Sequence, residues 1–537
     1  MNGFQPNGFA NLDGNKIMGV HLFKPDVEGQ YPDYLRDESR RRGRADLISF
    51  PASEEDIRQV LLSRHAITTQ GARTGVTGGA VPDGGHVLNL SRMTQITGMR
   101  IEPDQNEVFI SVQPGLALVE LRKILQTCEF DSSNWSPESL LALDQFRKTP
   151  AYFFPPDPTE TSASIGGMVA CNASGACTFR YGATRAYVEA MRVMLADGSV
   201  ISLRRGRERA TGGVFTLLTE EGREISGRLP DYIMPTVKNA AGFFVSENME
   251  LIDLFIGSEG TLGIISEIEL RLIRTPECRW GVMAFFSSEA SAVEFVKAVR
   301  VLPFGERPVA IEYFDTHALD LLRQQKLEHP GVLDIPALPS EYHTAIYLEY
   351  HGGTDQVSAA IAALPARMAA NGGNSEASWI ADSDRELERF KGFRHSVPEL
   401  VNRIIDERRI KEPELTKLGT DMAVLNSELS SVMDLYRNAL ESIGLDYVIF
   451  GHIGNNHLHV NILPRTLQEY QRGKDLYLQW ARQVIQWGGT VSAEHGIGKF
   501  KVALLREMLG DQVLRQMREM KKVFDPDAIL NKGNLFA

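Results

Sequence analysis

Three of the chain's 12 histidines lie within eleven residues, in the segment GHIGNNHLHVN that runs from Gly451 to Asn461. Its flanks are typical of short strands, and Asn455-Asn456 is typical of a two-residue hairpin turn. This turn predicts that His452 lies directly opposite His459, where cross-strand Cβ atoms are about 5 Å apart. The two imidazoles then point from one sheet face at one ion. A solvated polar hairpin explains the segment alone equally well.

A second polar group follows the hairpin in the segment SAEHGIG, where Glu494 and His495 sit in a glycine-flanked loop. The two-residue period of a strand also places His457 and Asn461 on the face of His459. Two imidazoles and one carboxylate, with coordination positions left open, suit Zn²⁺ and also Fe²⁺ or Mn²⁺. These residue types therefore favour a divalent metal site over a structural polar cluster.

The elements that must position these groups change in character along the chain. Residues 1–46 are mixed and polar and end in the charge run RDESRRRGRAD. Residues 47–275 open with a helix whose predicted N-cap is Ser53 and continue with strands and glycine-rich loops. Residues 276–490 alternate strands and helices, including a predicted helix TDQVSAAIAALPARMAA, and residues 491–537 return to glycine-rich loops. These four ranges are the predicted domain boundaries of an α+β protein.

Composition excludes several classes of function. The formal net charge is -12, which argues against broad binding to nucleic acid or to an anionic membrane. The four cysteines form no CxxC pair, so neither an iron-sulfur cluster nor a zinc ribbon is supported. No run of about 18 apolar residues occurs and no signal segment opens the chain, so we expect a cytoplasmic protein without a transmembrane segment.

Three glycine-rich runs separated by ordinary segments indicate one extended ligand lying along several loops. The first, QGARTGVTGG over residues 70–79, follows an apparent strand, but a turn and another strand come next. A Rossmann fold requires a helix at that place, so the pattern argues against it and a nest of loop amides is expected instead. The other two runs are PPDPTETSASIGGMVACNASG and IGSEGTLGI.

These runs, together with RYGATR, GHIGNNHLHVN, SAEHGIGKFK and the tail FDPDAILNKGN, resemble FAD-linked flavoproteins of the vanillyl-alcohol oxidase type. The similarity points to the branch of D-lactate dehydrogenase, D-2-hydroxyglutarate dehydrogenase and the glycolate oxidase D-subunit, and it spans about residue 47 to the C-terminus. It implies a two-part FAD-binding domain, made of 47–275 and the returning segment 491–537. It also implies an α+β cap domain with an antiparallel sheet over 276–490.

The resemblance further implies which residues hold FAD. The pyrophosphate would lie on Gly71, Arg73, Thr74, Gly75, Gly78 and Gly79. The rest of the cofactor would be lined by Pro156, Asp157, Thr161, Ser164, Gly166, Gly167, Asn172, Gly175, Gly182, Glu259, Gly260 and Ile265. No histidine occupies residues 70–79, so we expect non-covalent FAD.

Matching the motifs residue by residue gives the remaining roles. His452, His459 and Glu494 would be the metal ligands and His495 the general base, a role that suits an ordinary histidine pKa near 6.5. Asn461 would hydrogen-bond the substrate. The carboxylate of the substrate would meet the two upstream cations, which are Arg394 and Lys417.

Two positions depart from the family pattern. Relatives carry Gly-Asp-Gly-Asn before Leu-His, whereas this chain carries Gly-Asn-Asn-His, so His457 replaces an asparagine and is a candidate fourth ligand, second base or rim residue. Pro398 stands where the hydroxyglutarate enzymes have threonine, which weakens the case for a second carboxylate in the substrate. A short acid such as D-lactate is therefore favoured.

The resemblance implies an FAD-dependent dehydrogenase that oxidises a D-2-hydroxy acid to the 2-oxo acid. D-2-hydroxyglutarate, glycolate and a non-redox FAD-containing transferase remain the alternatives. No second redox carrier is visible in the sequence, so electrons would leave to a quinone, a cytochrome, an electron-transfer flavoprotein or oxygen. A cytoplasmic protein that docks peripherally at a membrane fits such acceptors, and a homodimer is one candidate assembly.

Overall fold

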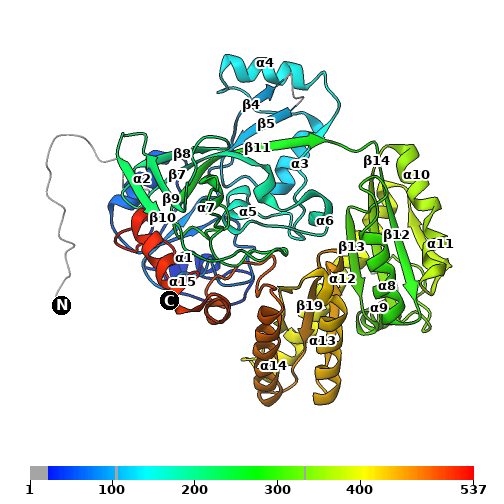
Figure 1. The fold of residues 1–537 in the computed structure, drawn as a ribbon. Helices are drawn as coiled ribbons and strands as arrows, with labels where there is room; N and C mark the ends of the chain where they lie inside the picture. Colours follow the sequence, from blue (N-terminus) through cyan, green and yellow to red (C-terminus); the bar gives the residue numbers. More distant parts are fainter. Residues whose placement is uncertain (1–21, 103–106, 330, 332–333, 537) are drawn as a thin grey trace, which may run out of the picture.

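The computed structural model describes residues 22–102, 107–329, 331 and 334–536. The first 21 residues of the predicted N-terminal arm lie outside the described residues. Within the described chain, an N-terminal α+β half and a second α+β region lie side by side (Figure 1). The last helix, α15 (Val502–Phe524), returns from the second region to the N-terminal half.

The N-terminal half begins with a small parallel sheet of order β1-β3-β2. Its first long helix starts as predicted, because the Ser53 side chain accepts a hydrogen bond from the backbone N–H of Asp56. The strand that precedes the first glycine-rich run is β2, and no helix follows it directly. The elements of this part are α1 (Val27–Gln30), β1 (Leu47–Ser49), α2 (Glu54–Leu62), β2 (Ile67–Gln70) and β3 (His86–Asn89).

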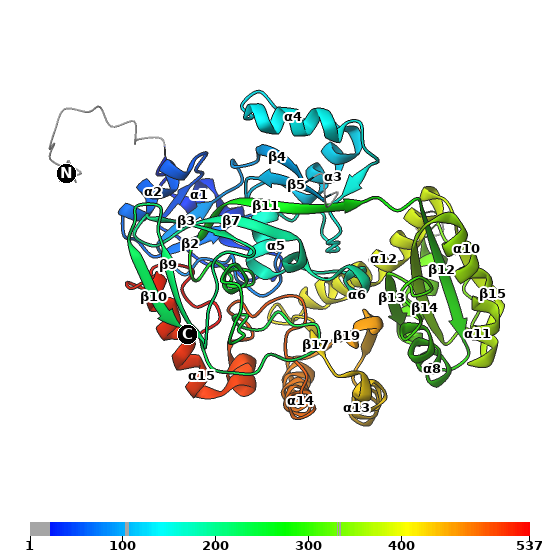
Figure 2. The same cartoon turned by 45° about the horizontal axis from the view of Figure 1, so that its top comes forward.

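A six-stranded antiparallel sheet forms the body of this half, in the order β4-β5-β11-β7-β8 with β6 paired at the end of β11. Figure 2 labels β4, β5, β11 and β7 of this sheet. Its strands are β4 (Ile96–Glu102), β5 (Glu107–Val112), β6 (Tyr152–Phe153), β7 (Val188–Met194), β8 (Val200–Arg204) and β11 (Ile264–Arg274). The hairpin β9 (Val214–Leu218) and β10 (Glu224–Arg228) stands beside it. The helices are α3 (Leu118–Thr127), α4 (Pro137–Phe146), α5 (Ile165–Cys171), α6 (Thr178–Tyr181) and α7 (Ile252–Phe255).

The second region is built on an eight-stranded sheet whose pairings are all antiparallel, in the order β15-β12-β14-β13-β18-β19-β16, with β17 paired to β19. The predicted fold class, α+β with an antiparallel cap sheet, is confirmed. The strands are β12 (Cys278–Phe286), β13 (Ala310–Phe314), β14 (Thr344–Gly352), β15 (Gly373–Ala381), β16 (Leu418–Gly419), β17 (Met422–Ala423), β18 (Tyr447–Gly451) and β19 (His457–Ile462).

Helices cover this sheet and extend from it. The predicted helix TDQVSAAIAALPARMAA is divided in two at Ala363, because Pro365 has no N–H to donate to the carbonyl four residues earlier and is accommodated in a first helical turn. The helices are α8 (Glu289–Arg300), α9 (Thr316–Glu328), α10 (Thr354–Ala362), α11 (Leu364–Ala370), α12 (Asp384–Arg409), α13 (Leu429–Ile443) and α14 (Leu467–Gln486). Among the described residues, no helix is both long and apolar enough to cross a membrane.

The C-terminal segment joins the core of the N-terminal half. Phe524 of α15 lies 5.1 Å, centroid to centroid, from Phe255 of α7. The buried Lys521 ammonium donates to the backbone carbonyls of Thr261 and Leu530, and it pairs with Asp525 at 2.6 Å. The C-terminal segment therefore packs into the N-terminal half of the protein.

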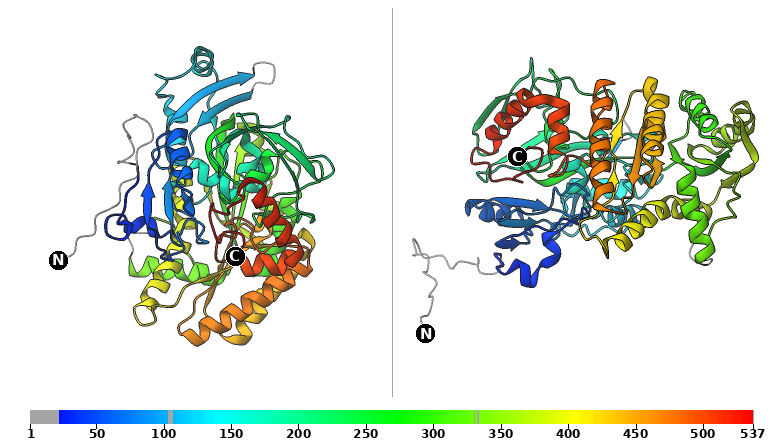
Figure 3. Two further views of the ribbon diagram at one scale, coloured as in Figure 1. Left: turned by 90° about the vertical axis from the view of Figure 1, so that its left-hand side faces the viewer. Right: turned by 90° about the horizontal axis from the view of Figure 1, so that it is seen from below.

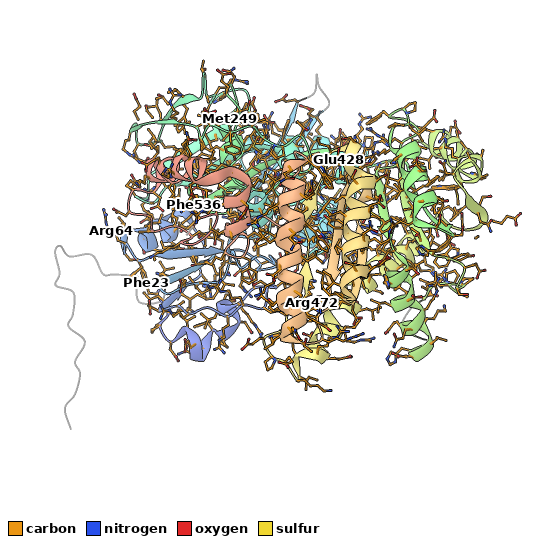
Figure 4. All side chains as sticks on the ribbon, turned by 60° about the horizontal axis from the view of Figure 1, so that its bottom comes forward. Phe23, Arg64, Met249, Glu428, Arg472 and Phe536 are labelled. Atoms are coloured by element: carbon orange, nitrogen blue, oxygen red, sulfur yellow. The ribbon has the colours of Figure 1, made fainter. Side chains whose placement is uncertain are left out.

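The helices α13 and α14 lie between the returning α15 and the cap strands (Figure 3). Figure 4 places Arg472 of α14 beside the end of α13. Its guanidinium donates to the Ile443 carbonyl at the C-terminus of α13, over 2.5 Å. This contact joins α13 to α14, the two helices that precede and follow the hairpin β18–β19 in the chain.

Candidate active site

The hairpin has a different register from the predicted one. Phe450, not His452, pairs with His459, and a 3-10 turn over Ile453–Asn455 joins the two strands. A two-residue type I′ turn needs positive φ at both central residues. Only Asn456 adopts it here, with φ 52, and its side chain is tied to the Val424 carbonyl over 3.1 Å. The longer loop carries His452 past the end of β18.

The loop nevertheless places the His452 ring beside those of His457 and His459. The ring centroids of His452 and His459 are 5.5 Å apart, and those of His457 and His459 are 4.5 Å apart. Glu494 joins them, with one carboxylate oxygen 3.1 Å from His452 Nε2. One donor atom from each of these four residues lies within 4.8 Å of the others. The three predicted ligands therefore lie together, and His457 lies with them.

Each of the three histidines has a second polar group behind it. Glu312 of β13 lies 2.7 Å from His452 Nδ1, and the Thr420 carbonyl lies 3.2 Å from His459 Nδ1. Behind His457, an Asp421 oxygen lies 2.9 Å from Nε2. Groups in such positions fix the tautomer and orientation of histidines that bind metals.

Burial determines the charge of these rings. It lowers the pKa of His457 to about 4, and it lowers the pKa of His459 well below the usual value. Burial also disfavours charge on His452, but the Glu312 carboxylate outweighs it and raises the pKa of His452 to about 9. Two of the rings are thus neutral at pH 7, which is the form that binds metals.

A lysine that the sequence did not single out also reaches the cluster. The Lys238 ammonium lies 2.8 Å from the Glu494 oxygen that faces His452, and its side chain is only 5% exposed. Burial raises the pKa of Glu494, but Lys238 and His452 lower it more, to well below its usual range. Glu494 is therefore charged, and it forms an ion pair with Lys238.

Asp421 holds the SAEHGIG loop against the cap sheet. Its carboxylate accepts hydrogen bonds from the backbone N–H groups of Glu494 and His495, at 3.2 Å and 3.0 Å. The side chains of Ser492 and Lys501 donate to it as well, at 2.7 Å and 2.5 Å. This buried carboxylate is fully satisfied and fixes the positions of the two residues that carry the predicted chemistry.

His495 itself lies beside the cluster. Its ring stacks on that of His459, with 5.4 Å between centroids and 18° between planes, and its Nδ1 is 3.6 Å from Asp421. Burial lowers the pKa of His495, although Asp421 opposes the shift. A neutral imidazole of this kind can accept a proton at pH 7.

The remaining predicted catalytic residues surround the hairpin. Arg394 of α12 lies 3.8 Å from Glu312, with its guanidinium 5.3 Å from the centre of the Tyr347 ring. Asn461 of β19 is buried, and its amide donates to the His459 carbonyl. Lys417 is half-buried just before β16, and burial lowers its pKa.

A cavity adjoins this cluster, and most of the predicted FAD-binding residues line it. The predicted residues on its walls are Gly71, Arg73, Thr74, Gly75, Gly79, Ser164, Gly166, Gly167, Glu259, Gly260 and Ile265. Glu494 and His495 line the same cavity, and so do Asn531 and Asn534 of the tail. The three glycine-rich runs therefore border one continuous space that reaches Glu494 and His495.

The other predicted FAD-binding residues lie off these walls. Two of them shape the loops. Gly175 leaves no room for a Cβ, which would lie 2.0 Å from the Asp157 carbonyl oxygen. Asn172 ends α5 with φ 49. Asp157 accepts a hydrogen bond from the Cys177 N–H. The full set off the walls is Gly78, Pro156, Asp157, Thr161, Asn172, Gly175 and Gly182.

The walls fit a flat, phosphate-bearing cofactor. A Cβ built on Gly75 meets no heavy atom within 4 Å, so that stretch of backbone faces open space. At Gly71 a Cβ would lie 2.1 Å from Ser164 Oγ, so two of the glycine-rich runs touch there. Leu90, Met168 and Ile264 add apolar surface. Bare backbone beside apolar walls is typical of cofactor sites.

Several site residues escaped sequence reasoning. Lys238, Glu312 and Asp421 contact the cluster, and Asn531 and Asn534 line the cavity. Each is a single polar residue in an otherwise ordinary stretch, far in sequence from the groups it touches. The tail motif FDPDAILNKGN contains both asparagines and is the one signal in the sequence that points to any of these residues.

Comparisons with known proteins agree with this geometry. Residues 275–535 match the family model described as FAD linked oxidases, C-terminal domain, and residues 138–204 match the model described as FAD binding domain. The described fold and the cavity define an FAD-binding protein with a cap domain. The chain belongs to the family of FAD-linked oxidases, as the resemblance implied.

Curated relatives extend along nearly the whole chain. A probable mitochondrial D-lactate dehydrogenase of Danio rerio is 29% identical over 508 residues, covering 93% of this chain and 86% of the relative. Glycolate oxidase subunit GlcD of Bacillus subtilis is 25% identical, covering 99% and 95%. A D-2-hydroxyglutarate dehydrogenase of Stutzerimonas stutzeri is 26% identical, covering 91% and 90%.

Among solved structures, an alkyldihydroxyacetonephosphate synthase superposes with a TM-score of 0.60 at 16% identity, covering 92% of this chain and 76% of the other. At this identity the likeness concerns the fold alone.

Proposed function

We propose that the protein is an FAD-dependent dehydrogenase that oxidises a D-2-hydroxy acid, with D-lactate favoured, to the 2-oxo acid. The observation that carries the proposal is the position of Glu494 and His495. Glu494 belongs to the cluster, the His495 ring stacks on that of His459, and both residues line the cavity bordered by the glycine-rich runs. The names of the curated relatives support the same substrate class.

In this proposal His452, His459 and Glu494 hold a divalent ion of Zn, Fe or Mn. Bound there, the ion supplies Lewis acidity that lowers the pKa of the substrate hydroxyl. FAD, bound without a covalent link, supplies the acceptor for the hydride from C2. The protein contributes a neutral ring at His459 and a charged carboxylate at Glu494. These are the protonation states that such an ion needs.

The substrate is bound and deprotonated by side chains around the hairpin. Arg394 and Lys417 provide the positive charge for the carboxylate, and Asn461 provides a hydrogen bond. His495 takes the hydroxyl proton, because its ring is neutral at pH 7 and stands beside His459 at the cavity wall. Loss of this proton would leave an electron pair on the substrate oxygen, which would form the carbonyl bond as the hydride leaves C2 for the acceptor that FAD would supply.

The preference for a short acid rests on Pro398. It lies one turn after Arg394 in α12, where it offers neither a backbone N–H nor a side-chain hydroxyl to a second carboxylate. D-2-hydroxyglutarate and glycolate are the next candidates, and a quinone, a cytochrome, an electron-transfer flavoprotein or oxygen would receive the electrons.

Anaerobic mixing of the FAD-loaded protein with D- and L-lactate, D-2-hydroxyglutarate and glycolate tests the proposal. Bleaching of the flavin absorbance is expected with D-lactate and is expected to disappear after treatment with a chelator. Retained FAD with no bleaching by any of these acids would refute the proposal and favour non-redox chemistry.

His495→Asn is the companion variant. We expect flavin reduction to slow by roughly 10²- to 10⁴-fold, the usual contribution of a general base, while FAD and metal contents stay unchanged. Reduction at the parent rate would remove His495 from its role without affecting the substrate assignment.

A further inference from the structure

The His457 side chain is fully buried, with 0% of its surface exposed, yet it is poorly satisfied. Among the described residues, neither of its ring nitrogens makes a hydrogen bond of good geometry. A buried polar group left in this state destabilises the fold. A partner that the protein chain does not supply would remove that cost.

The orientation of the ring shows where such a partner would sit. His457 Nε2 faces the Asp421 carboxylate at 2.9 Å, whereas Nδ1 faces the Glu494 carboxylate at 3.6 Å. His452 is arranged in the same way, with one nitrogen on Glu312 and the other toward Glu494. His457 thus has the two features of a metal-binding histidine: an outer carboxylate behind it and a second nitrogen aimed at the shared centre.

We infer that His457 is a fourth protein ligand of the divalent ion, alongside His452, His459 and Glu494. The inference rests on the metal site of the proposed function and deepens it. Four protein ligands would close a tetrahedral zinc site to substrate. The site therefore suits an ion that accepts five or six ligands, such as Mn²⁺ or Fe²⁺.

A second group of donors competes for this assignment. Asp421, His459 and His495 also offer ligand atoms within 4.8 Å of one another. An ion held there would occupy His495 and leave Nδ1 of His457 free. The experiment must therefore distinguish His457 from His495.

Mn²⁺ titration by calorimetry, with the FAD-loaded full-length protein, provides the test. His457→Asn is expected to weaken Mn²⁺ binding by roughly 10-fold or more, since even groups that only orient a ligand contribute that much. His495→Asn is expected to leave it unchanged. Pulsed EPR of the bound Mn²⁺ is expected to detect three imidazole nitrogens in the parent protein and two in His457→Asn.

Each outcome bears on one claim. If the parent protein binds Mn²⁺, His459→Asn abolishes binding and His457→Asn changes neither affinity nor nitrogen count, the fourth ligand is refuted while the proposed function stands. If His495→Asn is the variant that loses binding, the ion sits on the competing group and the inference again fails. If the parent binds neither Mn²⁺, Fe²⁺ nor Zn²⁺, the metal site of the proposed function fails. His457→Gln, which keeps a polar side chain, serves if His457→Asn loses its FAD.

Discussion

The Lys238 ammonium would compete with a metal ion at the candidate site for the Glu494 carboxylate. Its ammonium lies 2.8 Å from the same Glu494 oxygen that faces His452 and His457. Two cations cannot share that oxygen without repulsion, because the charges are within a few ångströms of each other in a buried setting. Metal binding must therefore displace the lysine from Glu494.

Replacing this lysine is expected to strengthen metal binding. In Lys238→Met the Glu494 carboxylate loses its internal partner, so a divalent ion becomes the favoured way to neutralise it. We expect the dissociation constant for Mn²⁺ to fall by roughly 10-fold. Calorimetric titration measures it, and Lys522→Met on the exposed face of α15 is the control. A weaker affinity in Lys238→Met would show that the lysine supports the site instead.

At the scale of elements, the cap sheet carries a half-buried carboxylate that should make its stability depend on pH. Glu349 of β14 lies 2.7 Å from His351 Nε2 and accepts a hydrogen bond from the Tyr347 hydroxyl at 2.8 Å. Burial opposes its charge, but these partners prevail and lower the pKa of Glu349 from 4.5 to about 2. A lowered carboxyl pKa stabilises the fold above pH 4.5, and this contribution is lost as the pH falls toward 2.

Glu349→Gln tests this dependence. The variant is expected to be less stable at pH 7 by an amount on the order of 3 kcal/mol, and the difference is expected to shrink as the pH falls from about 4.5 to 2. Chemical denaturation at a series of pH values measures it. Glu376→Gln, on an exposed position of β15, is the control. A difference that stays constant with pH would contradict the assignment.

The glycine-rich loop after β2 allows a test of the cofactor site. A Cβ at Gly75 meets no protein atom within 4 Å, so Gly75→Ala should leave the folded protein unchanged and intrude only on a bound cofactor. We expect FAD affinity to fall roughly 10-fold, since an added methyl group in a filled site costs about 1–3 kcal/mol. Fluorescence titration with FAD measures it. Gly392→Ala on α12, also in open space, should bind FAD normally.

The elements were accessible from sequence because they depend on local patterns, whereas the three-ligand set was predicted from the resemblance to the family. Strand and helix periodicity placed the cap elements, and Ser53 placed the start of α2. The hairpin register was not accessible, because it depends on Asn456 being held by Val424, a residue 32 positions away in the chain. The contacts of Lys238 and Asp421 were inaccessible for the same reason: they arise only from tertiary packing.

At the scale of the whole molecule, the site depends on a loop that both halves hold. Asp421 of the cap region fixes its Glu494 end, whereas Glu259 of the N-terminal half accepts hydrogen bonds from the N–H groups of Ile497 and Gly498, at 2.6 Å and 2.8 Å. A shift of one half relative to the other would therefore move this loop and, with it, the candidate base His495.

Glu259→Gln is expected to loosen this connection. An amide can accept at only one of its two terminal atoms, so one of the two N–H groups would face an NH₂ group, at a cost of roughly 1–3 kcal/mol. We expect weaker FAD binding and slower flavin reduction, measured by titration and by anaerobic stopped-flow. Glu267→Gln on β11 is the control. Unchanged values for both would show that Asp421 alone suffices to hold the loop.

The order in which the chain is made has a consequence for cofactor loading. Along the chain, the residues of the cavity wall run from Thr69 to Asn531 and Asn534. The hairpin histidines likewise precede Glu494, the carboxylate of their cluster. A growing chain that lacks Asn531 and Asn534 therefore has most of the cavity wall but cannot complete it. The complete cavity forms only after these residues have been made and have packed against the strands made first.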